Sequence, residues 1–563
     1  MVSAGNLTFV DGSPRLTGQY SGFDTNAIVE ATILGKRVPA VRMESTISNN
    51  KVQTAAYNQL NTLLSSLQSS LNGLRNPPGF SNLDKNIFEN KSGFLTSSST
   101  TPATNLLGVS TQNSAATGVY EVEILQLATA NKISTGVVTD SSAAQGITDT
   151  ITVGLSGGTT KDISITSDMS LSEIAEAING VKSDTGVRAS IVKVTDNDFR
   201  LVMTAEETGK AITLSGAGNF LSTYGDGSVL TELEAANKAQ IKVDGIATVI
   251  ERDSNNLDDV IDGVTLQLFK AEVGTTIKVE IDNNLGATKE AIDLFVNNYN
   301  SLRDFVTEQR NYDPTGGDST KPALYGDDIL RGIERTLSSI VSSGASGVEG
   351  NVSNTLGLIG ISLDQSNKLI INDKELDEAL VNDLDGVRSV FEFKFEPDDT
   401  RLQLISRNKE FTVNDFELVI DGIDGDGKIT GASVTGYGNV FDVNGNSLVG
   451  KEGTAFEGVV MAFIGTPGSG AQTIQVNTSY GIAEDFYQKI EGYIAPGSGN
   501  ISTRLVEIED ESKDLNEKIT ALDARLELTK QFLVEKYSKL EQALAQADAM
   551  RKQLEAMSNA NNK

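Results

Sequence analysis

The sequence predicts a multidomain, elongated α+β protein with paired N- and C-terminal coiled-coil helices, a helical body and inserted antiparallel β domains. Three observations lead to this fold class. The chain has 563 residues, which is enough for several domains. Helical periodicity marks both ends and returns in the middle. The intervals carry short alternating runs separated by Gly, Asn, Asp and Ser clusters, which indicate antiparallel strands.

The composition restricts the chemistry that the protein can perform. The chain has no Cys, His or Trp, and its 46 basic and 76 acidic residues give a net charge of −30. These absences exclude disulfides, Ser–His and Cys–His nucleophiles, and nearly all zinc, haem and iron–sulfur sites. The negative charge argues against nucleic acid as a partner. No apolar run reaches 18 residues, so we expect no membrane insertion. We expect neither an enzyme nor a cofactor.

The N-terminal region is predicted to be helical after a short tail. Residues 1–20 are polar and indicate a weakly ordered tail, without the basic start and apolar core of a cleaved signal peptide. A helix begins near Asp24 or Thr25, and Pro39 is expected to interrupt it. A second helix over residues 41–74 carries a weak heptad repeat, with consecutive polar positions at Thr46, Asn50 and Gln53.

Two stretches of the chain are predicted to form strands. The first runs from Phe80 to about Leu268, includes a short helix with a Ser-x-x-Glu cap at 170–179, and has a hairpin turn at Asp244-Gly245. The second runs from Phe391 to about Val476. Between and after them we expect helices over 288–310, 328–343, 373–384 and 482–494, with a β-type stretch over 356–371.

The C-terminal run from Ile501 to Met557 has the longest regular pattern in the chain. Alternating steps of four and three give 17 heptad positions, of which 14 are apolar; the exceptions are Ser512, Thr529 and Lys536. A helix of this length spans roughly 85 Å, and its apolar seam needs a partner. The partner is either the N-terminal heptad or another subunit. We predict assembly, because the seam is longer than any partner within the chain. The candidate assembly residues are Ile519, Leu522, Leu526, Leu533, Leu540 and Leu554.

One acidic loop deserves comparison with a calcium site. Asp424, Asp426 and Gly427 fit the middle of an EF-hand loop, but the loop's first and last ligand positions fall on Gly422 and Ser433. We therefore expect a hairpin turn here and no metal site.

Several segments form an ordered set along the chain. The first is 21–29 (SGFDTNAIV), followed by Lys36, Arg37 and Pro39. The others are 119–132 (VYEVEILQLATANK), 241–246 (IKVDGI), 256–268 (NLDDVIDGVTLQL), 295–302 (FVNNYNSL), 324–331 (LYGDDILR), 356–363 (LGLIGISL) and 497–504 (GSGNISTR). Taken in this order, the segments resemble the bacterial flagellar filament cap protein family, also called the hook-associated protein 2 family. The resemblance covers nearly the whole chain, apart from the first 20 residues and an added region from about 408 to 475.

The resemblance implies a homo-oligomeric ring at the tip of the flagellar filament that promotes folding and insertion of exported flagellin. It implies export by the flagellar type III system without a cleaved signal peptide. Further partners are junction proteins and a cytosolic export chaperone. A hook–filament junction protein and a coiled-coil surface adhesin are the alternatives.

The expected domains follow the same pattern. They are 1–45 with 515–563 as a terminal helical leg region, 46–78 with 285–395 and 481–514 as the helical body, 79–115 with 235–284 as an inner β domain, 116–234 as an outer β domain, and 396–480 as an accessory β module.

Overall fold

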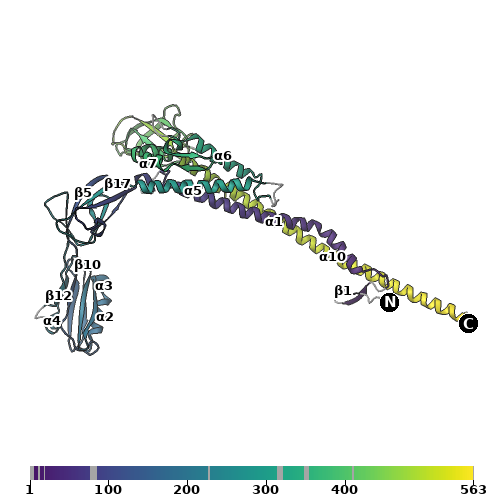
Figure 1. Cartoon of the computed structure of the whole chain (residues 1–563), viewed down its shortest axis with the longest axis horizontal. Coiled ribbons are helices and arrows are strands. Elements are labelled where there is room, and N and C mark those ends of the chain that lie inside the picture. Colours follow the sequence, from purple (N-terminus) through teal and green to yellow (C-terminus); the bar gives the residue numbers. More distant parts are fainter. Residues whose placement is uncertain are drawn as a thin grey trace. The chain divides into compact units, whose positions relative to one another are not determined.

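A computed structural model divides the chain into two compact units, residues 1–78 with 291–563 and residues 79–290. The structure describes residues 6–10, 13–17, 20–76, 85–225, 229–312, 321–347, 354–408 and 411–561. Helices and antiparallel sheets alternate along the chain, so the predicted multidomain α+β class is confirmed. Figure 1 shows the elements in their sequence colours.

The unit of residues 79–290 contains two separate apolar cores. The first core lies between a five-stranded sheet, in the order β14-β13-β5-β17-β3, and a three-stranded sheet, in the order β15-β16-β4. These strands are β3 (Lys91–Ser97), β4 (Leu107–Thr111), β5 (Gly118–Gln126), β13 (Ala239–Val243), β14 (Ile250–Arg252), β15 (Asn256–Ile261), β16 (Val264–Leu268) and β17 (Thr276–Asn283).

The second core of this unit is enclosed by two sheets and short helices. The sheets have the orders β12-β6-β10-β9 and β11-β7-β8. The strands are β6 (Ala130–Ser134), β7 (Asp149–Leu155), β8 (Thr160–Ile165), β9 (Val187–Thr195), β10 (Asp198–Thr208), β11 (Ile212–Ser215) and β12 (Thr231–Glu234), and the helices are α2 (Leu171–Gly180), α3 (Lys182–Thr185) and α4 (Gly218–Tyr224).

Two local predictions in this unit are confirmed. Ser170 caps α2, and Glu173 completes the capping box by accepting from the Ser170 backbone N–H. β13 and β14 form the predicted hairpin, and Asp244 and Gly245 both take a positive φ, 51° and 68°. That conformation suits Asp-Gly because glycine has no Cβ and aspartate tolerates the left-handed region.

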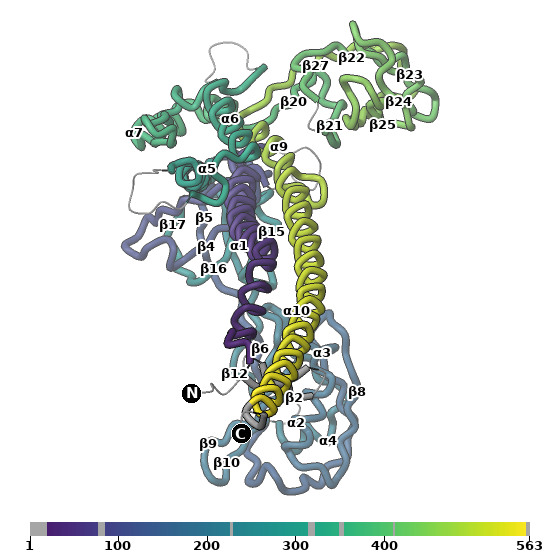
Figure 2. Tube along the Cα trace, turned by 90° about the vertical axis from the view of Figure 1, so that its right-hand side faces the viewer, coloured from purple at the N-terminus to yellow at the C-terminus, as the bar shows by residue number. Residues whose placement is uncertain are grey.

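The other unit is built on two long antiparallel helices, α1 (Thr25–Leu71) and α10 (Asn500–Asn561). They lie side by side in Figures 1 and 2, and the last turns of α10 extend past the beginning of α1. Around them are α5 (Leu285–Arg310), α6 (Asp328–Ser343), α7 (Asp373–Asn382), α8 (Leu384–Phe391), α9 (Ile482–Ile494), β18 (Ile361–Leu363) and β19 (Leu369–Ile371). An aromatic cluster joins α5, α8 and α9: the ring centroid of Phe295 lies 6.0 Å from that of Phe391 and 5.8 Å from that of Phe486.

Residues 393–480 form a β module within the same unit. Two four-stranded sheets, β20-β27-β22-β23 and β21-β26-β25-β24, enclose its apolar core. The strands are β20 (Phe393–Pro397), β21 (Leu402–Ser406), β22 (Asp415–Ile423), β23 (Ile429–Val434), β24 (Phe441–Asn444), β25 (Ser447–Gly450), β26 (Val460–Phe463) and β27 (Gln472–Tyr480).

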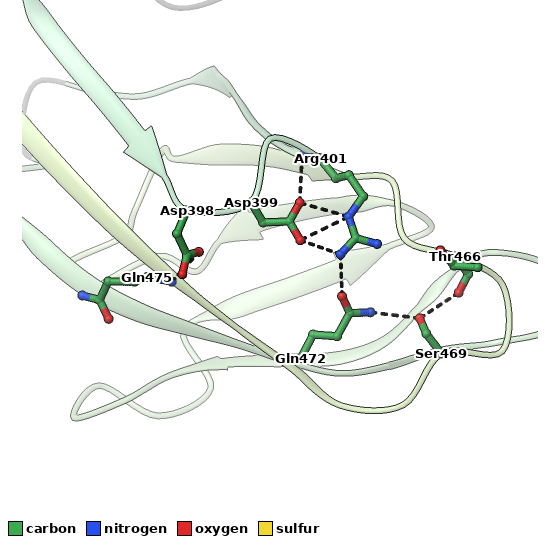
Figure 3. A network of polar contacts seen from close by, with 7 residues as sticks. All are labelled: Asp398, Asp399, Arg401, Thr466, Ser469, Gln472 and Gln475. Atoms are coloured by element: carbon green, nitrogen blue, oxygen red, sulfur yellow. Dashed lines mark hydrogen bonds and ion pairs between the residues drawn. The ribbon is translucent and has the colours of Figure 1, made fainter.

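A polar network fastens two connections of this module to each other (Figure 3). Arg401, between β20 and β21, makes a bidentate ion pair with Asp399, with its Nε 3.0 Å from Oδ1. Its Nη2 donates to Gln472 Oε1 at 2.8 Å, and Gln472 Nε2 donates to Ser469 Oγ at 2.9 Å. The hydrogen bonds from Arg401 hold the pKa of Asp399 below its usual range. The connection before β21 is thus tied to the one before β27.

Two expectations for the N-terminal region are wrong. Pro39 does not interrupt the helix, because α1 is continuous from Thr25 to Leu71. The N-terminal tail is not without structure, since β1 (Asn6–Val10) and β2 (Ser13–Thr17) pair as antiparallel strands. The prediction that Asp24 starts the helix is confirmed, because its side chain accepts from the Ala27 N–H.

Packing on α10 explains why Pro39 is tolerated. A proline inside a helix removes one hydrogen bond and clashes with the carbonyl four residues earlier. The residue whose carbonyl faces the proline ring is Gly35, which has no side chain. Arg37 binds Asp523 of α10 just before the proline, and Ala40 is fully buried just after it. These contacts hold the helix on both sides of Pro39.

Candidate assembly surface

The pairing of α1 with α10 determines which part of the predicted seam is covered. Arg37 makes a bidentate ion pair with Asp523, with Nε–Oδ1 and Nη2–Oδ2 distances of 3.0 and 3.1 Å. Farther along α1, Asn50 contacts Ser512. Just before α1, the backbone N–H groups of Tyr20 and Ser21 donate to Glu541. The two helices therefore run antiparallel, and Glu541 marks the level at which α1 begins.

The polar interruptions of the two heptads meet each other. Asn50 is 6% exposed, and its Nδ2 donates to Ser512 Oγ at 3.1 Å and to Glu511 Oε2 at 3.2 Å. A buried amide that finds its partners only at one register favours that register over its neighbours. Ser512 thus completes a polar layer in the helix pair.

The six candidate residues fall into three groups along α10. Leu526 is buried, at 5% exposure, while Ile519, Leu522 and Leu533 are half-buried. Leu540 and Leu554 are exposed, at 46% and 67%. The first four lie at the levels that α1 reaches. Leu540 lies at the level of the segment that precedes α1, and Leu554 lies beyond it. The structure therefore covers only part of the predicted seam.

The covered face of α10 departs from the heptad after Leu533. Before this point the buried and half-buried positions follow the predicted steps. Beyond it they are Val534, Tyr537, Ser538, Glu541, Leu544, Ala545 and Asp548, whereas the heptad continues through Lys536, Leu540, Ala543, Ala547 and Met550. A straight helix drifts by about 20° per heptad, so five heptads from Ile501 rotate the seam by about 100°, the angle of one residue. The second half of the seam thereby turns outward.

Sequence reasoning missed two further exposed apolar rows. On α1, Leu34, Val38, Val41 and Val52 are exposed, on the side opposite the buried positions Ala40 and Ile47. On α10, Leu528 and Phe532 precede the exposed half of the seam, which continues through Leu540, Met550, Leu554 and Met557. The steps of four and three from Leu34 to Val41 were the available signal on α1. The apolar positions on the covered face of α1 were the stronger signal in the sequence.

Glu541 fixes the beginning of α1 to α10. Its side chain is almost fully buried and accepts from the Tyr20 N–H at 2.9 Å, and it also accepts from the Ser21 hydroxyl. Backbone donors that point at a carboxylate make charge-assisted hydrogen bonds, which are stronger than neutral ones. No sequence pattern indicates this contact, because Tyr20 and Glu541 are about 520 residues apart in the chain.

Tyr57 joins the helix pair to α6. Its buried hydroxyl donates to Asp327 Oδ2 at 2.6 Å, and Asp327 Oδ1 accepts the Leu330 N–H as the N-cap of α6. Burial, and then the bond to Asp327, raises the pKa of Tyr57 well above its ordinary value. The phenol therefore stays a donor across the physiological range.

The acidic loop near Asp424 is the hairpin turn between β22 and β23. Asp424 Oδ1 accepts the N–H groups of Asp426 and Lys428, and Gly427 has a φ of +84°. Among the described residues, no group of three or more carboxylates is arranged to hold a metal ion. Within the same residues, no helix is long and apolar enough to cross a membrane.

Comparisons with known proteins agree with this architecture. The family model "Flagellar hook-associated protein 2 C-terminus" matches residues 236–549, and the corresponding N-terminus model matches residues 21–131. The "Flagellin hook IN motif" matches residues 150–207.

Individual relatives give the same picture. The flagellar hook-associated protein 2 of Escherichia coli K12 is 30% identical over 391 residues, which cover 66% of this chain and 78% of that protein. The B-type protein of Pseudomonas aeruginosa is 31% identical over 312 residues, and the match spans 51% of this chain and 64% of that relative's length. A crystal structure of the flagellar cap protein D1-D2-D3 domains from Escherichia coli is 29% identical, covers 60% of this chain and 89% of its own, and has a TM-score of 0.46.

The C-terminal family model alone spans more than half of the chain. The N-terminal model matches a region that contains all of α1, and the C-terminal model extends to residue 549 within α10, so most of the helix pair lies in matched sequence. The chain therefore belongs to the flagellar hook-associated protein 2 family, the structural cap proteins of the bacterial flagellum.

Proposed function

We propose that the protein forms a homo-oligomeric ring at the tip of the flagellar filament, where it promotes the folding and insertion of exported flagellin. The observation that carries this proposal is the exposed apolar half of the α10 seam, above all Leu540 and Leu554. Exposed apolar rows on a long helix mark surfaces that a partner covers. Family membership supports the flagellar filament as the structure in which this surface meets its partner.

The two exposed rows differ, and this difference favours a ring. One row lies on α1 (Leu34, Val38, Val41) and the other on α10 (Leu540, Leu554). A contact between unlike surfaces of identical subunits is head-to-tail, and such contacts close into rings when the rotation allows. We propose that the α1 row of one subunit packs on the α10 row of the next.

The same proposal includes the remaining binding partners and the export route. Flagellin, junction proteins and a cytosolic export chaperone would each contact the protein at a different stage. Export would use the flagellar type III system without a cleaved signal peptide. We propose five domains, and three separate apolar cores support the three β domains. The expected boundary at residue 116 is moved past β5 (Gly118–Gln126), because this strand pairs with β13 and β17 and packs in the inner core.

The test combines assembly with motility. Leu540→Ser with Leu554→Ser should abolish the oligomer in analytical ultracentrifugation and filament elongation in cells. The melting temperature of the monomer should stay unchanged, because both side chains are already exposed. Val506→Ser is the matched control, since Val506 is an exposed apolar residue of α10 outside this row. Normal assembly of the double variant would rule out this surface.

Location separates the cap from its alternatives. Immuno-electron microscopy should place the protein at the filament tip. Label at the hook–filament junction would support a junction protein. Cell attachment that persists without flagella would support an adhesin.

A further inference from the structure

A cavity of about 310 Å³ lies where the β module joins the helices. Its wall combines the end of α6, the segment between β21 and β22, and the junction of β27 with α9. The lining includes Ser343, Arg407, Asn414, Tyr480, Asp485 and Gln488. One water in the liquid takes about 30 Å³, so the cavity has room for a small organic molecule.

Two hydrogen-bond donors in this wall have no acceptor. The Arg407 side chain is only 3% exposed, and its Nε has no hydrogen-bond partner. The Tyr480 hydroxyl also has none. The guanidinium carbon of Arg407 lies 5.4 Å from the centroid of the Tyr480 ring, so the two donors belong to one location. Buried donors without partners are rare in folded proteins and call for a ligand or an ordered water.

The charges around the cavity do not balance. Glu484 makes ion pairs with both Arg407 and Arg75, the latter at 3.1 Å. Asp485 pairs with Lys489 at 2.8 Å. Counted over these described residues, three cations and two carboxylates leave an excess of one positive charge. Burial lowers the pKa of Arg407, although the ion pair with Glu484 acts in the opposite direction.

We propose that this cavity binds a small monocarboxylate, whose oxygens accept from Arg407 Nε and Tyr480 Oη. A planar carboxylate fits the edge of a guanidinium, and one negative charge balances the one uncompensated cation. A dianion such as phosphate would face Glu484 and Asp485. Both donor atoms are closed to solvent, so binding requires a lining side chain to move. Gln488 occupies such a position, and its Nε2 donates to Glu484 Oε1 at 2.6 Å.

The test measures thermal unfolding of the full chain in sodium acetate and in sodium chloride at equal ionic strength. Acetate should raise the melting temperature further than chloride, and the excess should saturate, because a ligand of the native state stabilises it by mass action. Tyr480→Phe removes one donor and should weaken the apparent acetate affinity about fivefold.

Two further variants complete the design. Arg407→Met combined with Glu484→Gln removes the cation and its counterion together, and should abolish the acetate-specific shift. Arg401→Met is the control, because Arg401 is a partly exposed arginine of the same module, away from the cavity. A wild-type chain without a saturable acetate shift overturns the proposal. So does an equal shift in the wild type, in Tyr480→Phe and in the double variant.

Discussion

Single side chains hold distant parts of this chain together through hydrogen bonds that are sensitive to protonation. Glu272 is the clearest case in the unit of residues 79–290. Thr101 Oγ1 donates to its Oε2 at 2.9 Å, and Thr275 Oγ1 donates to its Oε1 at 3.0 Å. Bonds from Ser99, Thr101 and Thr275 lower the pKa of Glu272 to about 2. These hydroxyl donors thus stabilise the ionised form of the Glu272 side chain.

This shift predicts an acid-dependent loss of stability. The folded-state pKa lies below the ordinary value of 4.5, so the stabilisation is complete above pH 4.5 and is lost as the pH falls towards 2. Glu272→Gln should destabilise the protein at pH 7, and the difference from wild type should shrink over that range. Chemical unfolding at several pH values measures it. Glu251→Gln on an exposed strand serves as the control, and a difference that is constant with pH would contradict this account.

Tyr57 makes a residue-scale prediction of a different kind. Tyr57→Phe removes the donor to Asp327 and leaves a carboxylate oxygen without that partner. We expect a loss of about 1–3 kcal/mol in the free energy of unfolding. Tyr437→Phe should change it by less than about 0.5 kcal/mol, because Tyr437 is half exposed. Urea unfolding of both variants checks the contrast.

At the scale of elements, the polar layer of the helix pair sets register. Asn50→Leu and Ser512→Leu should each destabilise the protein, since each leaves a polar partner behind. The double variant should recover stability, because two leucines pack on each other. A double-mutant cycle should therefore give a coupling energy of about 0.5–3 kcal/mol. The same cycle between Asn50 and Thr529 should be additive, and additivity for Asn50 and Ser512 would show that the layer is not coupled.

Elements also show how far the sequence alone could predict the fold. The capping box at Ser170, the Asp244-Gly245 turn and both terminal helices depend on local chemistry, so a sequence pattern reveals them. The continuity of α1 through Pro39 depends on contacts with Asp523 and its neighbours in α10. The outward turn of the seam after Leu533 depends on α10 lying straight beside α1 rather than supercoiling with it, which no local pattern contains. Of the candidate surface, the pattern supplied Leu540 and Leu554 and missed Leu34 and Phe532.

At the scale of the whole molecule, the weak points of the α10 seam should control filament growth. Thr529 is half-buried and Lys536 is exposed, and both interrupt the apolar row. Polar heptad positions lower the stability of a coiled coil and permit exchange of partners. Replacing both with leucine should slow elongation if, as we propose, the cap steps as subunits are added.

The measurement is filament length against time in cells that express each variant. Gln531→Leu with Gln542→Leu adds the same apolar groups to exposed positions of α10 outside the row, and should leave the rate unchanged. Equal growth of the Thr529/Lys536 variant and wild type would remove the link between seam strength and stepping.

The 3.5-residue repeat of α10 also determines the direction in which its apolar row winds around the helix. A row with this repeat winds to the left around a helix of 3.6 residues per turn. α1 follows the row only as far as Leu533, so the chain alone does not complete the winding. A neighbour that binds Leu540, Met550 and Leu554 must continue it and cross α10 at a left-handed angle. A bundle built from such neighbours would twist in one sense, and pushing subunits beneath it would turn it in a preferred direction.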